Sequence, residues 1–167
     1  LVSGGHISDG FVSFELLVAA LCGVMIIPFV YYIAFYRVLR ERFLLWHATV
    51  VACLFTHITA SSGLVNHFID LTVTQATALS VTSWTLGIVA AGNFMVNLVE
   101  DGKLDAWHRR LTHVLSAMIV AGLLFFLFAG GLLRTWTTPV FVFMFFPVLG
   151  SFSLMSATAL LRGSRAM

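Results

Sequence analysis

The sequence predicts an all-α integral membrane protein, a five-transmembrane-helix bundle with the N-terminus outside and the C-terminus in the cytoplasm. Composition is the first reason. Of the 167 residues, 60% are hydrophobic and 10% are charged, whereas a soluble domain carries about a quarter charged residues. Length is the second reason. Five apolar runs come close to or exceed the ~20 residues that cross a bilayer, and they cover residues 14–36, 43–65, 72–98, 111–133 and 139–161.

The third reason is the distribution of positive charge. When the five runs are threaded alternately across a membrane, all but one of the nine basic residues fall on one face, and Arg134 falls on the other. Those on the shared face are Arg37, Arg40, Arg42, Lys103, Arg109, Arg110, Arg162 and Arg165. Positive charge in short loops stays in the cytoplasm, so this face is predicted to be the inner one. The short loops leave no room for an aqueous domain, so residues 1–167 are predicted to form a single membrane domain.

The first two spans have local features that support them. The first, 14–36, contains Pro28, which bends a helix or leaves a carbonyl free for a neighbour. It ends in aromatic residues followed by arginines, a pattern that the headgroup boundary favours. The second, 43–65, contains His47 and His57, and His67 follows it. At this ten-residue spacing the imidazoles are expected near the cytoplasmic face, near mid-membrane and at the outer edge.

The third span, 72–98, contains a stripe of small residues. Ser83, Gly87 and Ala91 recur every four positions, so they share one helix face and allow another helix to approach closely. Asn93 and Asn97 lie one turn apart in the cytoplasmic half. Their amides could hydrogen-bond to a quinone carbonyl, but bonds across to another helix are the favoured interpretation.

The fourth and fifth spans, 111–133 and 139–161, have recognisable starts. Asp105 is a candidate N-cap ahead of the fourth span. Pro139 suits the first turn of the fifth span, which Pro147 then interrupts.

Two histidines of different spans lie at matching depth. His47 is about four residues into the second helix and His113 about three into the fourth, which places both ~5–6 Å below the same interface. Paired imidazoles at one depth are what a b-type haem requires, and Arg109 and Arg110 could pair with its propionates. Alternatively, both histidines are interfacial residues that bond to lipid or loop groups. His57 either satisfies itself in a polar seam between helices or binds a cofactor shared with another subunit.

Five helices, histidines near helix ends and the His-Arg-rich entry at 107–113 resemble the small b-type cytochrome membrane anchors of respiratory dehydrogenases, of the nitrate reductase gamma or succinate dehydrogenase type. The resemblance implies one haem b, electron exchange with a quinone, and other membrane subunits as partners. Those anchors often hold two haems through four histidines. This sequence departs from that pattern, because its first, third and fifth spans contain no histidine.

A second group of polar residues is expected at the outer face. His67 and Asp70, together with Asn66, His6 and Asp9, could bind zinc or copper, although a hydrated loop explains them equally well.

Two functions follow from these observations. The first is an electron-transfer subunit of a respiratory complex, and the alternative is a non-catalytic accessory subunit of a respiratory or photosynthetic complex. Both predict partner membrane proteins and a bilayer, in a bacterial-type inner membrane or an organellar equivalent. The net charge of +2 reflects the loop arginines and does not indicate nucleic-acid binding. Retinal chemistry is excluded because the one lysine, Lys103, lies in a loop.

Overall fold

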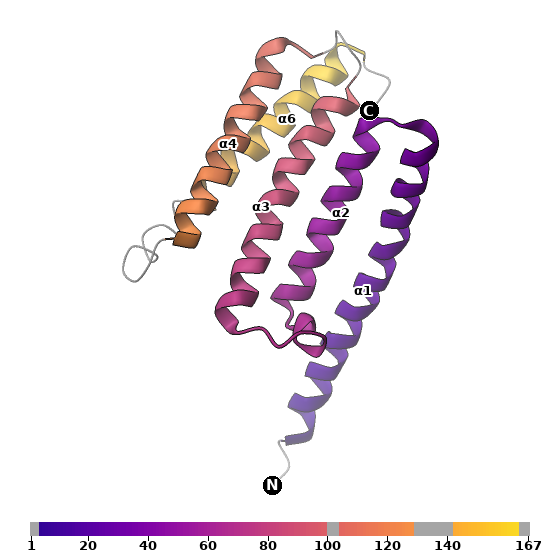
Figure 1. Cartoon of the computed structure of the whole chain (residues 1–167), viewed down its shortest axis with the longest axis vertical. Coiled ribbons are helices and arrows are strands. Elements are labelled where there is room, and N and C mark those ends of the chain that lie inside the picture. The colour runs from indigo at the N-terminus through magenta and orange to yellow at the C-terminus, as the bar shows by residue number, and fades with distance from the viewer. Residues whose placement is uncertain (1–3, 100–103, 129–141, 164–167) are drawn as a thin grey trace.

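The computed structural model describes residues 4–99, 104–128 and 142–163, with side chains from residue 14 onward, and all of its regular elements are helices. Figure 1 shows them as a bundle of helices that lie side by side. In chain order they are α1 (Gly4–Leu39), α2 (Arg42–Ser61), the short 3-10 helix η1 (Leu64–His67), α3 (Val73–Leu98), α4 (Ala106–Phe128) and α6 (Phe145–Leu161). The all-α prediction is therefore confirmed.

Four of these helices are long and apolar enough to cross a membrane: Phe14–Leu39 within α1, and the whole of α2, α3 and α4. The shortest of the four has 20 residues, and at 1.5 Å per residue it reaches about 30 Å. The helix α6 has 17 described residues, about 25 Å, and is shorter than the fifth span that the sequence predicts. The predicted start of that span at Pro139, and the end of the fourth span, lie outside the described residues.

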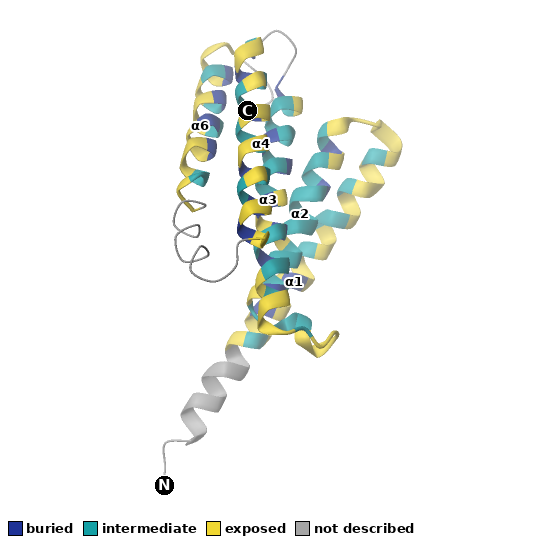
Figure 2. Cartoon of the chain, turned by 60° about the vertical axis from the view of Figure 1, so that its left-hand side comes forward, coloured by how far each residue is buried: buried dark blue, intermediate teal, exposed yellow. Residues whose placement is uncertain are grey.

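Consecutive helices run in opposite directions and lie side by side (Figure 1). The helix α3 is central, because it packs against α2 on one side, against α4 on the other, and also touches α6. The helix α1 packs against α2, and α6 packs against α4. In Figure 2 the buried residues of α6 lie on the side that faces α4, and its outward side is exposed. This exposed apolar surface matches a bilayer environment.

The interface between α2 and α3 confirms the small-residue stripe. A Cβ atom added at Gly87 would lie 3.2 Å from the Cβ of Cys53 in α2. That distance is tighter than ordinary packing, so the two backbones come as close as a missing side chain allows. Ser83 and Ala91 line the same side of α3, against Val50 of α2.

The chain turns between α2 and α3 through a single left-handed residue. Gly63 has φ +81°, a conformation that favours glycine. This turn ends α2 at Ser61, four residues before the predicted end of the span at 65, and η1 follows. The helix α3 then starts with a capping box between Thr72 and Gln75, which satisfies backbone groups that the first turn leaves open.

One end of the bundle collects the described arginines. The connection between α1 and α2, the start of α4 and the end of α6 all lie there (Figure 1). We call it the basic end, and the opposite end the far end. Its arginines are Arg37, Arg40, Arg42, Arg109, Arg110 and Arg162.

Candidate functional site

An ion pair closes the basic end between α4 and α6. Asp105 stands immediately before α4, and Arg162 immediately after α6. Arg162 Nη1 donates to Asp105 Oδ1 and Nη2 donates to Oδ2, each over 2.7 Å. This two-bond geometry fixes orientation as well as distance. The bonds from Arg162 hold the pKa of the Asp105 carboxyl below its ordinary value, and the same contact raises the pKa of Arg162.

A buried histidine lies beside this ion pair. His108, in the first turn of α4, is 3% exposed and stacks on Trp107 with ring centroids 4.0 Å apart. Its Nε2 lies 3.4 Å from the hydroxyl of Thr158 in α6. Its Nδ1 is 3.9 Å from Asp105 Oδ2, which is too long for a hydrogen bond. The imidazole therefore provides a second polar contact between α4 and α6.

Below these polar groups the three helices approach each other closely. Thr112 in α4 donates to the His108 carbonyl and points its hydroxyl at Met155 Sδ in α6, 3.5 Å away. A Cβ atom at Gly92 of α3 would lie 3.0 Å from Thr112 Cγ2 and 3.2 Å from Phe152 Cε1. Gly92 therefore allows α3, α4 and α6 to meet. We call this region the junction, and it comprises Gly92, Asp105, His108, Thr112, Phe152, Met155, Thr158 and Arg162.

The junction ion pair makes stability depend on pH. Because the folded-state pKa of Asp105 is lowered, the stabilisation is present above the ordinary carboxyl pKa of about 3.9 and is lost as pH falls through the lowered value. We expect the detergent-unfolding midpoint to fall as the pH is lowered from about 4 toward the lowered pKa of Asp105. In Asp105→Asn this part of the pH dependence should disappear. An identical pH profile in both proteins would contradict the assignment.

His57 bridges α2 and α3. Its Nδ1 lies 3.0 Å from the carbonyl oxygen of Ser80 and 3.0 Å from the Ser80 hydroxyl, and its ring is 4.9 Å from that of Trp84. This is the polar seam expected from the sequence. Its depth differs from the mid-membrane position expected, because His57 is four residues, about 6 Å, from the end of α2 at Ser61. The histidine therefore lies in the half of the bundle near the far end.

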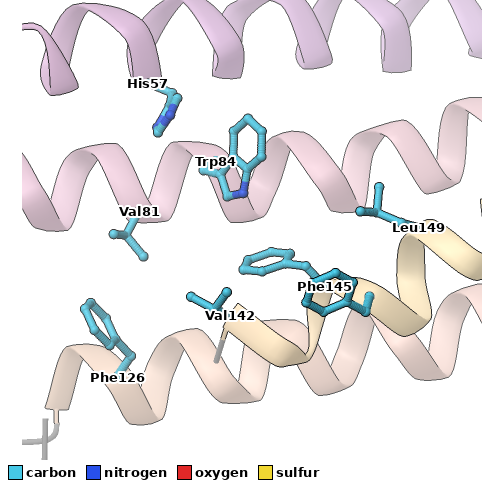
Figure 3. Close-up of a pocket in the computed structure, with 8 residues that line it drawn as sticks. His57, Val81, Trp84, Phe126, Val142, Phe145 and Leu149 are labelled. Carbon is cyan, nitrogen blue, oxygen red and sulfur yellow. The ribbon is translucent and has the colours of Figure 1, made fainter. Parts of the chain in front are cut away.

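A cavity of about 370 Å³ opens beside His57. Figure 3 shows side chains from α2, α3, α4 and the start of α6 converging on it. Among the described residues the lining is aromatic and aliphatic apart from the imidazole and the indole N–H. The lining residues are His57, Val81, Trp84, Phe126, Val142, Phe145, Phe146 and Leu149.

The structure places the two candidate haem ligands in different surroundings. The ring of His47 lies between Tyr32 of α1, 4.1 Å away, and Phe94 of α3, 5.0 Å away. His113 is exposed on α4, and α3 lies between α2 and α4. Matching depth in the sequence therefore does not bring the two imidazoles together in the described chain. Haem ligation by this pair stays a prediction.

The arginines expected beside the haem lie in the first turn of α4. Arg109 is half-buried and Arg110 is exposed. Both belong to the basic end, next to the junction. The propionate pairing suggested for them also stays a prediction.

The candidate metal residues at the far end are spread out. His67 and Asp70 are both exposed, and His67 Nε2 lies 4.0 Å from Glu15 Oε1. Among the described side chains no three histidines, cysteines or carboxylates gather closely enough to hold a metal. The side chains of His6 and Asp9 lie outside the described residues.

Asn93 and Asn97 donate their amide protons within α3. Asn93 Nδ2 bonds to the Val89 carbonyl over 2.9 Å, and Asn97 Nδ2 bonds to the Asn93 carbonyl over 2.7 Å. The cross-helix bonds expected of these donors are therefore not seen among the residues that the structure describes. Each amide instead uses the backbone carbonyl one turn back in its own helix.

Comparison with known families settles the class of this chain. The family model described as 7TM diverse intracellular signalling matches residues 14–167. The chain belongs to this family. It is an integral membrane protein of the bacterial cytoplasmic membrane. No curated protein and no solved structure matches it.

This membership corrects two expectations. The resemblance to b-type cytochrome anchors is wrong, and so is the assignment to a respiratory electron-transfer complex or to an accessory subunit of one. Helix number, histidines near helix ends and arginines at a membrane face occur in many membrane bundles, because the bilayer selects them for reasons unrelated to redox chemistry.

Sequence reasoning missed the residues that form the junction. The sequence marks Asp105 only as a candidate N-cap, and His108 only as a member of the His-Arg-rich entry at 107–113. The available signal was spacing. His108 and Thr112 are one turn apart, on the face that later carries Ile119 and Leu123, so both were placed to point at the core.

Proposed function

We propose that this chain is the membrane-embedded sensory domain of a signalling protein, which carries a change of state from the far end of the bundle to the basic end. In this proposal the basic end faces the cytoplasm, by the rule that short cytoplasmic loops are rich in arginine. The N-terminus is then outside, α6 completes a fifth span, and the chain forms one membrane domain. The bilayer covers the exposed apolar faces, and other membrane proteins are candidate partners there.

The observation that carries this proposal is the position of α6. At its start, Phe145, Phe146 and Leu149 line the cavity. At its end, Thr158 and Arg162 contact His108 and Asp105 at the junction. A single 17-residue helix therefore touches both places. Because an α-helix transmits displacement along its axis, a shift of the first turn of α6 is expected to move the last turn.

The proposal is tested by filling the cavity and measuring the junction. Leu149→Trp adds bulk at a residue that lines the cavity, whereas Leu154→Trp adds the same bulk on the same helix at a residue that does not line it. The two leucines are similarly exposed, 53% and 45%, so they differ mainly in their contact with the cavity. Spin labels at exposed Arg110 in α4 and exposed Leu161 in α6 report the distance between the helices at the basic end.

We expect Leu149→Trp to change the distance distribution between these labels, and Leu154→Trp to leave it as in the unfilled protein. The measurement is pulsed electron spin resonance in lipid nanodiscs, with Cys22 and Cys53 replaced. An unchanged distribution in Leu149→Trp, with the helix content retained, would contradict transmission through α6.

A further inference from the structure

We propose that the cavity beside His57 binds a hydroxylated aromatic molecule of the phenol type, whose hydroxyl donates a hydrogen bond to His57 Nε2. The cavity volume of about 370 Å³ falls at the small end of the range for ligand pockets, about 300–1,000 Å³. A ring with a short substituent suits such a volume. This inference rests on the proposed function and adds a ligand class to it. Its test measures ligand binding alone, so the ligand proposal and the transmission through α6 can fail independently.

The partners of His57 fix which nitrogen carries the proton. Its Nδ1 faces the carbonyl oxygen of Ser80 at 3.0 Å, and a carbonyl oxygen can only accept. If Nδ1 lacked a proton, two lone pairs would meet at this distance. In the neutral form of the ring, this contact favours the tautomer with the proton on Nδ1, and the Ser80 hydroxyl lies near the same nitrogen. In this tautomer Nε2 is an acceptor.

In the described part of the chain, no residue makes a hydrogen bond to the acceptor nitrogen. His57 lines the cavity, and its hydrogen bonds to the described residues all involve Nδ1. An acceptor next to an apolar space favours a ligand that supplies a donor. A carbonyl or ether oxygen, which only accepts, gains nothing there. The tautomer thus selects hydroxyl-bearing ligands over their methyl ethers and ketones.

The walls of the cavity favour an aromatic body. Trp84, Phe126, Phe145 and Phe146 line the cavity from three different helices (Figure 3). Aromatic side chains pair with a ring in offset or edge-to-face geometry, beyond the general gain of apolar burial. Because the cavity lies near the far end of the bundle, such a ligand would enter from that side of the membrane, either dissolved or as the head of a lipid.

The test compares labelled 4-butylphenol with 4-butylanisole. The two differ by one methyl group that removes the donor. Equilibrium binding to the chain in nanodiscs is corrected with empty nanodiscs, because the ether partitions into lipid more strongly than the phenol. We expect saturable binding of one phenol per chain, about tenfold tighter than the ether, the effect of one hydrogen bond. A phenol with a sixteen-carbon tail distinguishes a lipid ligand from a dissolved one. Tighter binding of the tailed phenol indicates a lipid, and tighter binding of 4-butylphenol indicates a dissolved molecule.

Two substitutions on α6 locate the binding. Leu149→Trp adds bulk at the cavity wall and should abolish saturable phenol binding, whereas Leu154→Trp, at a similarly exposed residue that does not line the cavity, should retain it. His57→Phe should bring the phenol and ether affinities together, and circular dichroism checks that each variant folds. Equal affinities for phenol and ether in the unmodified chain would overturn the proposal. So would phenol binding that survives Leu149→Trp, or the absence of saturable binding.

Discussion

Gly92→Val is expected to destabilise the bundle by about 1–3 kcal/mol, the usual cost of forcing bulk into a packed region. A Cβ atom at this position would lie 3.0 Å from Thr112 Cγ2 and 3.2 Å from the Phe152 ring. Valine adds two more methyl groups, so α4 and α6 must move away from α3. The measurement is the unfolding midpoint in mixed detergent micelles, followed by circular dichroism.

A matched control separates packing from helix propensity. Gly23 is also helical, and an added Cβ atom there meets nothing within 4 Å. Gly23→Val therefore makes the same chemical change without the overlap. We expect its midpoint to stay near that of the unmodified chain. Equal midpoints for the two variants would show that the close approach at Gly92 does not support the bundle.

Met155→Ala is the second substitution with a large expected effect. Met155 is 1% exposed and belongs to the buried cluster with Val99, Leu104 and Ala159. Truncation of such a side chain leaves a cavity and typically costs about 2–5 kcal/mol in soluble proteins. Inside a membrane bundle the loss of packing contacts is the main cause of destabilisation. We therefore expect the free energy of unfolding to fall by about 2 kcal/mol, the lower end of that range.

The neighbouring residue provides the control for this second prediction. Leu154 lies on the same helix and is 45% exposed, and exposed substitutions usually change stability by about 0.5 kcal/mol or less. Leu154→Ala should therefore unfold close to the unmodified chain. Equal unfolding midpoints for Met155→Ala and Leu154→Ala would show that the junction is not a packed core.

The architecture was accessible from the sequence where the bilayer imposes it. Span lengths follow from membrane thickness. The arginines gather at the basic end because short loops on the cytoplasmic side of a membrane retain positive charge. The contact of Gly87 with α2 was also predictable, since small residues every four positions form a single face. The end of α2 could not be predicted in the same way. The apolar run continues through Gly63, where the backbone adopts a left-handed conformation and the helix has already ended.

The site was less accessible, because it depends on contacts between distant parts of the chain. Asp105 and Arg162 are 57 positions apart, and nothing local marks them as partners. The sequence predicts either a polar seam or a cofactor at His57, but its partner Ser80 is 23 positions away and nothing local marks it. The sequence also misplaced the depth of His57. It indicated that His47 and His113 lie near the starts of their helices, but not which side of the bundle each one faces. For this reason His47 and His113 looked like a pair.

The central claim is that α6 acts as one rigid element between the cavity and the junction. A double-mutant cycle tests it most directly. Ser153 and Leu154 are exposed in the middle of α6, and replacing both with glycine loosens the helix there without touching either site. The distance between labels at 110 and 161 is then measured with and without Leu149→Trp, in both backgrounds. In the continuous helix we expect Leu149→Trp to shift the distance between the labels. In the glycine background we expect the same substitution to leave this distance unchanged. A shift of equal size in both backgrounds would contradict transmission through α6.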